Sequence, residues 1–516
     1  MHTPSPALAA RAVLDRARRS RDARFDGRFF VAVTSTGIYC RPVCPAPSPR
    51  TAHVRYFASA AAAADAGFRP CLRCRPEAAP GTPAWLGTSA VVRRALSLIH
   101  DGALDTSSVD TLAARLGIGP RHLHRLFVCH VGAPPLAVAH TRRLHFAKRL
   151  IDETDLSMTD VALASGFGSL RRFNAAFRST YERAPSALRR LRGAGATGRD
   201  GQLVLRLAFR PPYEFDHLLG FLAARALPGV ERVDASGYVR TVALDSGAAV
   251  VCVARPSRGV SGRRSSAVQD ALELQIDGAP AAALLRLTAD ARRVFDLAAD
   301  PAEIAAALAP DPLLGSLVRR RPGLRIPGAW DAFECAVRAV LGQQVSVAAG
   351  RTFASRVVER AGACLAVPRH GLTRVFPSPA ALAAADLSGI GLTSGRARAL
   401  HALAQLVAEG RLDLRGSADD VTAGLRAVPG VGDWTAQYVS LRALGEPDAF
   451  PAADLVLRRA AGGPPGPLSA RALAERAEAW RPWRGYAVFH LWAEARAGNR
   501  EDAAARTTGA RRRNGD

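Results

Sequence analysis

Lysine is almost absent from this chain of 516 residues, in which Lys148 is the only lysine among 70 basic residues. Chemistry that needs a lysine nucleophile is therefore excluded everywhere except around Lys148. The chain also lacks an apolar run long enough to cross a bilayer, and Met1–Ser20 lacks the apolar core of a secretion signal. These absences predict a cytoplasmic protein without a membrane partner.

Acidic residues are too few to balance the arginines, so the formal net charge is +25. The excess is uneven, because residues 1–200 carry 30 Lys/Arg against 14 Asp/Glu, whereas residues 201–516 carry 40 against 31. Nucleic acid is favoured as the partner over a membrane, since no basic amphipathic anchor stands out. A GC-rich genome also enriches a protein in arginine, so the net charge alone does not identify the partner. The length predicts three or four domains.

Only eight cysteines are present, and in a reducing compartment they indicate metal or thiol chemistry rather than disulfides. Four of them form two close pairs, Cys40-x3-Cys44 and Cys71-x2-Cys74, which is the spacing of a four-thiolate zinc site. A polar segment this small would have little core without a metal. We expect the remaining four to be buried small hydrophobic residues: Cys129, Cys252, Cys335 and Cys364.

The residues around these pairs, GIYCRPVCP at 37–45 and GFRPCLRC at 67–74, resemble the N-terminal domain of the Ada adaptive-response family. The resemblance covers about residues 10–78 and implies a small zinc domain over 1–78. In that family the first cysteine is both a zinc ligand and a nucleophile that takes a methyl group irreversibly from a methylated DNA phosphate. By position that residue is Cys40. The Pro-Cys-His-Arg sequence needed for the second Ada activity, O6-methylguanine repair, is absent.

After a linker at Pro76–Gly87, helical periodicity extends over residues 88–192. A capped helix from Ser108, a turn at Gly117–Gly119 and a helix from Pro120 form a unit that recurs from Thr159 onward. Two such units joined by a long helix resemble the all-α AraC-type DNA-binding domain. The alternative is a generic helical bundle with a solvated basic face. The resemblance places groove contacts at the starts of the second helices: Arg121, His122, Arg125, Arg171 and Arg172.

A second linker at Gly193–Gly201 precedes a region of alternating hydrophobicity from Leu203 to about Leu287. This pattern predicts an antiparallel α+β domain over 203–320, with a helix at Phe215–Ala226 packed on the sheet and a polar hairpin tip at Pro256–Ser266. Helices resume near Asp296 and predict an all-α domain over 321–500. The tail 501–516 is expected to be disordered. The predicted fold class is therefore multidomain α+β.

The turn Val428–Gly432 lies between predicted helices at 418–427 and 433–443. Its glycines permit a tight turn with outward amides, Asp433 is expected to cap the second helix, and a phosphate fits there. For a bare Gly-Val-Gly an ordinary helix–helix turn is the alternative. Further along, Asp454 is an isolated acid ahead of an apolar-basic helix. With Trp434 and Tyr438 one helical turn apart, this stretch resembles the helix-hairpin-helix, Gly/Pro-rich, aspartate DNA glycosylase superfamily.

Within that superfamily, residues 203–500 resemble the AlkA alkylbase glycosylases, through Arg210–Tyr213, Gly342–Ser346 and Arg481–Trp492 among other segments. The resemblance implies that Asp454 is the catalytic carboxylate, although it could equally be a helix N-cap. It assigns DNA contacts to Gln344 and to four residues of the hairpin: Pro429, Gly430, Val431 and Gly432. In relatives a monovalent cation takes part in binding the DNA phosphate at this hairpin. The resemblance assigns the base pocket to four aromatic rings: Phe221, Tyr438, Trp434 and Trp492. Aromatic residues at helical spacing more often lie in the hydrophobic core, and this is the alternative for Phe221 and Tyr438.

Two positions depart from AlkA: Gln344 replaces a leucine wedge, and Ala493 replaces an aromatic residue beside the pocket. Where bifunctional relatives carry a Schiff-base lysine, this chain has Trp434, so lysine-dependent strand nicking is excluded. We therefore expect a monofunctional glycosylase for alkylated bases fused to a zinc methyl acceptor and a transcription regulator. The alternative is a regulator whose glycosylase half only binds DNA.

The expected partners are alkylated double-stranded DNA, promoter DNA and RNA polymerase. We expect a monomer associated with a bacterial nucleoid.

Overall fold

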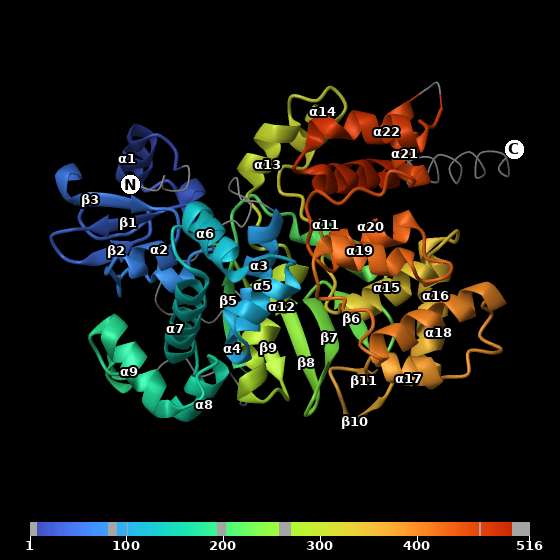
Figure 1. The fold of residues 1–516 in the computed structure, drawn as a ribbon, viewed down its shortest axis with the longest axis horizontal. Helices are drawn as coiled ribbons and strands as arrows, with labels where there is room; N and C mark the ends of the chain where they lie inside the picture. The colour runs from blue at the N-terminus through green and yellow to red at the C-terminus, as the bar shows by residue number, and fades with distance from the viewer. Residues whose placement is uncertain are drawn as a thin grey trace, which may run out of the picture.

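The computed structural model describes residues 8–80, 90–100, 102–192, 203–256, 270–463 and 466–497 (Figure 1). The predicted linker Gly193–Gly201, most of the hairpin tip Pro256–Ser266 and the tail 501–516 lie outside these ranges. Within them, no helix is long and apolar enough to cross a membrane. The chain forms a small β-rich domain, a helical region, a five-stranded sheet with helices, and a second helical region, in that order.

The N-terminal domain is a four-stranded sheet in the order β3-β1-β2-β4, where β1 pairs antiparallel with β2 and β3, and β2 pairs parallel with β4. Its own apolar core is small and consists of two hydrophobic clusters in the described residues, while α2 adds to a cluster shared with the following helices. Its elements are α1 (Arg11–Ser20), η1 (Ala23–Phe25), β1 (Phe30–Val33), β2 (Ile38–Cys40), η2 (Thr51–His53), β3 (Val54–Phe57), α2 (Ala60–Asp65), β4 (Arg69–Pro70) and η3 (Pro76–Ala78).

Two helix-turn-helix units follow, and they share the long helix α7 (Figure 1). The predicted cap at Ser108 is confirmed, because Ser108 Oγ accepts from Thr111 N, and Ser169 Oγ likewise accepts from Arg172 N at the start of α9. The helices are α3 (Ala90–His100), α4 (Ala103–Thr106), α5 (Val109–Arg115), α6 (Pro120–Val131), α7 (Pro135–Glu153), α8 (Met158–Ala164), α9 (Leu170–Tyr181) and α10 (Pro185–Arg192).

The predicted antiparallel sheet is confirmed, with the order β5-β9-β8-β7-β6 and antiparallel pairing throughout. Alternate residues such as Leu205, Leu207, Val251 and Val253 are buried against the helices. The elements are β5 (Leu203–Ala208), α11 (Phe215–Ala223), β6 (Glu231–Asp234), β7 (Gly237–Leu244), β8 (Gly247–Ala254), β9 (Ala271–Asp277), η5 (Ala281–Ala283), α12 (Leu284–Val294), α13 (Pro301–Leu308) and α14 (Leu314–Arg320).

The last region is mainly helical, and its core is formed by α15, α16, α18, α19 and α20. Its elements are α15 (Ala332–Leu341), α16 (Val347–Ala361), β10 (Cys364–Arg369), β11 (Leu372–Arg374), α17 (Pro379–Ala384), α18 (Ser394–Ala408), α19 (Ala418–Arg426), α20 (Asp433–Arg442), α21 (Leu455–Gly462), α22 (Ala470–Ala477) and η6 (Glu478–Trp480). Residues 484–497 are also helical. The prediction of buried cysteines is confirmed for Cys335 but wrong for Cys364, which is exposed on β10, while Cys129 and Cys252 are only half-buried.

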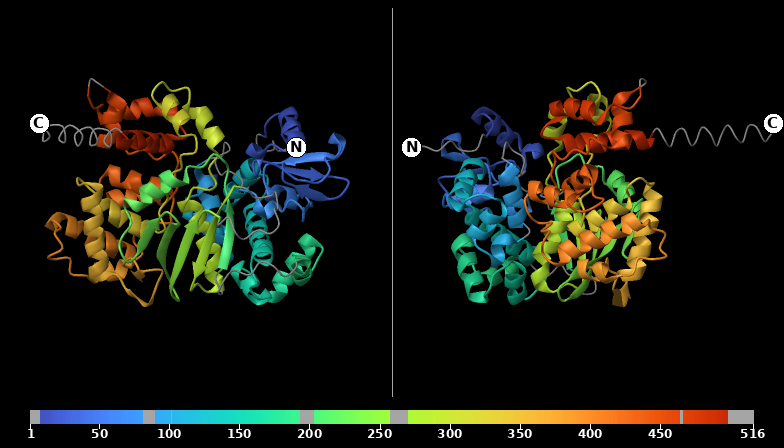
Figure 2. Two further views of the ribbon diagram at one scale, coloured as in Figure 1. Left: turned by 180° about the vertical axis from the view of Figure 1, so that it is seen from behind. Right: turned by 45° about the vertical axis from the view of Figure 1, so that its right-hand side comes forward.

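The N-terminal domain and the helix-turn-helix units lie together on one side of the central sheet (Figure 2). The first unit shares a hydrophobic cluster with α2, whereas the second shares the large cluster of the sheet domain, and α8 packs on η5. Polar contacts also join the two halves of the chain: Arg93 pairs with Glu446 at 3.4 Å, and Arg94 Nε donates to Gly416 O at 2.9 Å. The N-terminal and C-terminal halves of the chain are therefore packed directly against each other.

Candidate functional site

A cavity of about 350 Å³ opens beside α15, α20 and the start of α21, and Asp454 lies in its wall. The carboxylate is buried, with 9% exposure, and is held from three directions. Its Oδ2 accepts from Trp434 Nε1 at 2.8 Å, and its Oδ1 accepts from Leu457 N at 2.9 Å and from Trp492 Nε1 at 3.3 Å. Asp454 is thus the N-cap of α21, and two indoles fix the orientation of its carboxylate.

Three of the four predicted pocket rings line this cavity: Trp434, Tyr438 and Trp492. Trp434 and Tyr438 are one turn apart on α20, and their rings stack at 5.2 Å with an interplanar angle of 15°. The Tyr438 and Trp492 rings are 6.2 Å apart at 48°. The cavity therefore presents aromatic faces next to an anchored carboxylate.

Phe221 lies elsewhere, since it is 4% exposed, packs against Phe489 at 5.5 Å, and is not among the described residues that line the cavity. The Arg225 guanidinium carbon lies 3.7 Å from the centre of its ring, and that of Arg442 lies 4.8 Å away. Arg225 and Arg442 line the cavity themselves. Arginine therefore occupies the place where the sequence analysis expected an aromatic ring.

The predicted hairpin joins α19 to α20 through a tight turn in which Gly430 adopts a φ of 84°, a conformation that favours glycine. Val428 and Val431 are buried and anchor the turn, whereas Pro429, Gly430 and Gly432 are exposed. The expected cap is wrong, because Gly432 is the N-cap and Asp433, in the first turn, pairs with Arg426. An acid in the first turn still opposes the positive end of the helix dipole.

The segment between α15 and α16 is tied to the hairpin by Gln343, a residue that the sequence analysis did not single out. Its Nε2 donates to Gly430 O at 3.0 Å and to Thr435 Oγ1 at 2.9 Å, and Arg396 Nη2 donates to its carbonyl at 2.7 Å. The next residue, Gln344, is exposed and has a φ of 54°. The bonds of Gln343 thus hold this strained turn beside the hairpin.

Three functional candidates were missed by sequence reasoning: Arg225, Gln343 and Arg442. Arg442 lies four residues after Tyr438 on α20, and Arg225 lies four residues after Phe221 in the turn that follows α11. Four residues is the spacing at which helical side chains meet. That spacing was the available signal for them. For Gln343 there was none, because its partners lie about ninety residues along the chain.

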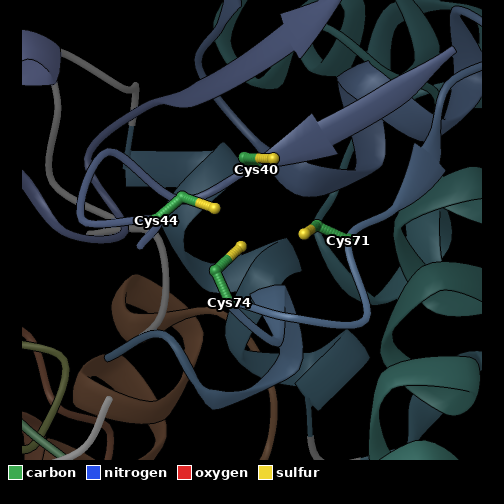
Figure 3. Close-up of side chains that lie close together, drawn as sticks. All are labelled: Cys40, Cys44, Cys71 and Cys74. Carbon is green, nitrogen blue, oxygen red and sulfur yellow. The ribbon is translucent and has the colours of Figure 1, made fainter. Parts of the chain in front are cut away.

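The four predicted zinc ligands meet in the N-terminal domain, with their sulfur atoms pointing toward one another (Figure 3). All four Sγ atoms lie within 4.8 Å of one another. A tetrahedral zinc with Zn–S of about 2.3 Å needs sulfurs roughly 3.8 Å apart, so this donor set fits the metal. Cys71 and Cys74 are buried, whereas Cys40 and Cys44 are half-buried.

Backbone amides reach several of these sulfurs: Arg41 N donates to Cys74 Sγ at 3.3 Å, and amides of Ala46 and Cys74 donate to Cys44 and Cys71. Because amide donors withdraw electron density from sulfur, these contacts lower the nucleophilicity of the Cys44, Cys71 and Cys74 sulfurs.

The predicted groove-contact residues are all exposed: Arg121, His122 and Arg125 on α6, and Arg171 and Arg172 on α9. On α6, His122 Nδ1 and Arg125 Nη2 are 2.8 Å apart. Arg121 and His122 lie in the first turn of α6, and Arg171 and Arg172 lie in the first turn of α9, so both N-terminal turns present basic side chains to solvent.

Four protein families match the chain in series. The metal binding domain of Ada matches residues 14–77, and a helix-turn-helix domain matches 112–191. The AlkA N-terminal domain matches 204–331, and the HhH-GPD superfamily of base excision DNA repair proteins matches 337–463.

Among curated relatives, the probable bifunctional transcriptional activator/DNA repair enzyme AlkA of Mycobacterium tuberculosis is 45% identical over 483 residues, covering 92% of this chain and 95% of that protein. DNA-3-methyladenine glycosylase 2 of Escherichia coli is 36% identical over 292 residues, covering 55% and 95%. A 3-methyladenine DNA glycosylase structure from Archaeoglobus fulgidus superposes with a TM-score of 0.49 at 23% identity, covering 56% and 98%.

Proposed function

The chain belongs to the family of bifunctional transcriptional activators and DNA repair enzymes of the AlkA type, and from that premise we infer that it is an alkylation-response protein with two DNA-directed activities. Its glycosylase half hydrolyses the N-glycosidic bond of alkylated bases of the 3-methyladenine type. Its N-terminal half binds zinc and reads DNA as a transcription regulator.

The observation that carries the glycosylase role is the anchored carboxylate of Asp454 in the cavity wall. As the C1′–N bond breaks, positive charge grows on the sugar, and a fixed carboxylate in a dry site stabilises it without reorganising. The same group orients the attacking water. We assign this role to Asp454 because its orientation is set before the substrate enters.

The rings of Trp434, Tyr438 and Trp492 are the surfaces on which we place the flipped base. A base alkylated at a ring nitrogen is cationic, and each aromatic face that it meets contributes about 0.5–2 kcal/mol. Because such a base leaves as a neutral molecule, no dedicated general acid is required.

The hairpin is the proposed grip on the DNA backbone. Its exposed Pro429, Gly430 and Gly432 precede the positive end of α20, so a phosphate and a shared monovalent cation fit there. Gln344, exposed at the neighbouring turn, takes the position of the wedge that fills the space of the flipped base. A glutamine there can replace base-pair hydrogen bonds.

We propose Cys40 as the methyl acceptor. Its sulfur attacks the methyl carbon of a methylphosphotriester, the C–O bond breaks, and the electron pair leaves with the phosphate, which becomes an ordinary diester. Cys40 ends as a thioether, so each chain reacts once. Zinc held by the four cysteines would keep the attacking sulfur in the thiolate form at neutral pH.

We propose domain limits of 1–78, 88–192, 203–320 and 321–500. We also propose that the protein is monomeric, cytoplasmic and associated with the nucleoid. RNA polymerase is the proposed partner of the helix-turn-helix region when that region is bound to a promoter. Basic groups at the starts of α6 and α9 support binding of the helix-turn-helix region in the major groove.

Purified full-length protein incubated with methylated duplex DNA tests the glycosylase directly. Release of free base in excess of enzyme is expected. Binding without release would favour the competing view that this half only holds DNA for the regulator. In parallel, DNA carrying labelled methylphosphotriesters should transfer one label per chain, and Cys40→Ala should abolish the transfer while Cys364→Ala leaves it intact.

A further inference from the structure

The first helix-turn-helix unit contacts the glycosylase half immediately before α19. Arg94 on α3 donates from Nε to Gly416 O at 2.9 Å and from Nη2 to Arg415 O at 2.6 Å. Arg115, the last residue of α5, donates from Nη2 to the same Arg415 carbonyl at 3.1 Å. The residue that follows Gly416 is Ser417, the N-cap of α19. Two arginines of the N-terminal half therefore hold the chain at the point where α19 begins.

The same unit also contacts the chain just after α20. Arg93 Nη2 lies 3.4 Å from Glu446 Oε2, and the two side chains are each 13% exposed, so solvent screens this ion pair only in part. The Glu446 amide donates to Ser440 O in the last turn of α20 at 3.2 Å, which fixes the acid to the helix that it follows. We call the three arginines on α3 and α5 the clamp: Arg93, Arg94 and Arg115.

The clamp and the hairpin lie at opposite ends of α19 and α20. The chain enters α19 beside the clamp, leaves it for the hairpin at Val428–Gly432, and returns along α20 toward Glu446. A helix of nine or ten residues is about 14 Å long, so a tilt of about 4° at the clamp moves the hairpin by about 1 Å. The clamp is thus placed where a small displacement is amplified at the site that grips DNA.

A cavity of about 1190 Å³ lies between the two halves beside the clamp. Residues of α3 and α5 line it on one side, and residues of β7, α15 and the segment before α19 line it on the other. Arg94, Arg115 and Arg415 are among these lining residues. Because packed side chains do not fill this part of the contact, the polar contacts of the clamp carry more of the positioning than they would in a close-packed interface.

We propose that the first helix-turn-helix unit has a second function as a positioning element of the glycosylase half, in which its clamp sets the tilt of α19 and α20 and thereby the place where the hairpin meets a DNA phosphate. The proposal rests on the glycosylase function inferred above. The unit can serve both functions, because the clamp uses α3 and the end of α5, whereas the predicted groove-contact residues of the unit are exposed on α6: Arg121, His122 and Arg125. A glycosylase made of residues 203–500 alone would lack the clamp.

The test is single-turnover excision of 3-methyladenine from a duplex by the full-length protein over a range of protein concentrations. It gives a half-saturating concentration and a maximal rate, and both report productive binding at the glycosylase site. Arg94→Met should raise the half-saturating concentration at least about tenfold, because a displacement of about 1 Å is sufficient for a loss of this size. The maximal rate should fall less, since Asp454 is also held by Leu457 N and Trp492. Arg94→Lys should restore part of the loss, because its ammonium group can still donate to a carbonyl.

Arg149 on α7 provides the matched control. It is 8% exposed, close to the 7% of Arg94, and its Nη2 donates to the carbonyl of Arg206 on β5 at 2.5 Å. Arg149→Met therefore removes the same kind of contact between the same two halves, but away from α19 and α20. It should leave the half-saturating concentration unchanged, and thermal unfolding of both variants shows whether their losses of stability are comparable.

The ion pair of the clamp is tested by a double-mutant cycle. Arg93→Met and Glu446→Gln should each raise the half-saturating concentration, and the double variant should raise it no further than the larger single effect. Additive effects would overturn the proposal, as would equal rises for Arg94→Met and Arg149→Met or an Arg94→Met variant that behaves as the wild type. If Arg94→Met does not fold, the cycle decides. Failure of the wild type to release any base would instead refute the glycosylase function itself.

Discussion

The indole Nε1 of Trp434 donates a 2.8 Å hydrogen bond to Oδ2 of Asp454. Trp434 is the second residue of α20, immediately after the hairpin, whereas Asp454 caps α21 twenty residues later. One side chain therefore connects the proposed DNA grip to the proposed catalytic carboxylate. Whatever fixes the start of α20 on DNA also fixes the position of that carboxylate.

Asp454→Asn should lower base release at least ~100-fold while DNA affinity stays within a few fold, because the amide keeps the cap but loses the charge that stabilises the sugar cation. Single-turnover excision and binding to lesion DNA measure the two effects. The control is Asp448→Asn, since Asp448 pairs with Arg484 at 2.9 Å and does not line the cavity. Near-normal turnover by Asp454→Asn would show that another group carries the reaction.

Trp434→Phe should lower the excision rate about tenfold, or roughly 1.4 kcal/mol, because it keeps a ring in the stack but removes one donor to the carboxylate. Combined with Asp454→Asn it should cost little more, since both changes remove the same interaction. Trp480→Phe is the matched control: its Nε1 donates to Asp311 Oδ2 at 2.7 Å away from the cavity. Equal losses in the two tryptophan variants would contradict a positioning role.

Abasic DNA should accumulate with its strand unbroken, because no lysine can attack the sugar. The only lysine, Lys148, is buried in α7 and lies 2.5 Å from Asp152 Oδ2. Gel analysis before and after alkaline cleavage measures this. A covalent adduct trapped by borohydride on the glycosylase half would be the contrary result.

Methylation of Cys40 should strengthen promoter binding ten- to a hundredfold, about 1.4–2.8 kcal/mol. Four thiolates around Zn²⁺ carry a net charge near −2, and conversion of one to a thioether removes about one negative charge beside the DNA backbone. Tyr39, next to Cys40, also links the zinc site to the helix-turn-helix region, since the Tyr39 hydroxyl oxygen lies 2.8 Å from His145 Nε2 on α7.

Promoter affinity is measured at several salt concentrations before and after exposure to methylphosphotriester DNA. Cys40→Ser is the control and should show no methyl-dependent change. Equal affinities for the unmethylated and methylated wild type would leave the zinc domain as a repair module alone.

Asp296→Asn should stabilise the protein at pH 7 but not below pH 4. Burial raises the pKa of Asp296 to about 6, although its Oδ2 accepts from the Tyr486 hydroxyl at 2.7 Å. A carboxyl whose folded pKa exceeds its unfolded value gives stability that is present below about pH 4 and lost as the pH rises through 6. Two pKa units correspond to no more than about 3 kcal/mol at pH 7.

Thermal unfolding between pH 4 and 8 measures the effect. Asp311→Asn is a control of opposite sign, because burial would raise its pKa but the Trp480 hydrogen bond and backbone amides lower it. That variant should lose stability at pH 7. A parallel response of the two variants to pH would refute the assignment.

Several features of this protein were determined by short stretches of sequence. The cysteine pairs need only local turns and one fold-back to bring four sulfurs together, and Ser108 and Ser169 cap their own helices through bonds that span three residues. The single lysine confines lysine chemistry to the surroundings of Lys148. Local pattern also predicted the antiparallel sheet, since alternation reports directly which face is buried.

What the tertiary structure decided is the composition of the pocket. Phe221, Tyr438 and Trp492 come from segments far apart in the chain, and only their packing determines that Arg225, rather than Phe221, lines the cavity. The same holds for Gln343, whose partners on the hairpin follow about ninety residues later. Periodicity identifies the buried face of a helix but not its neighbour, because that depends on how whole side-chain surfaces fit together.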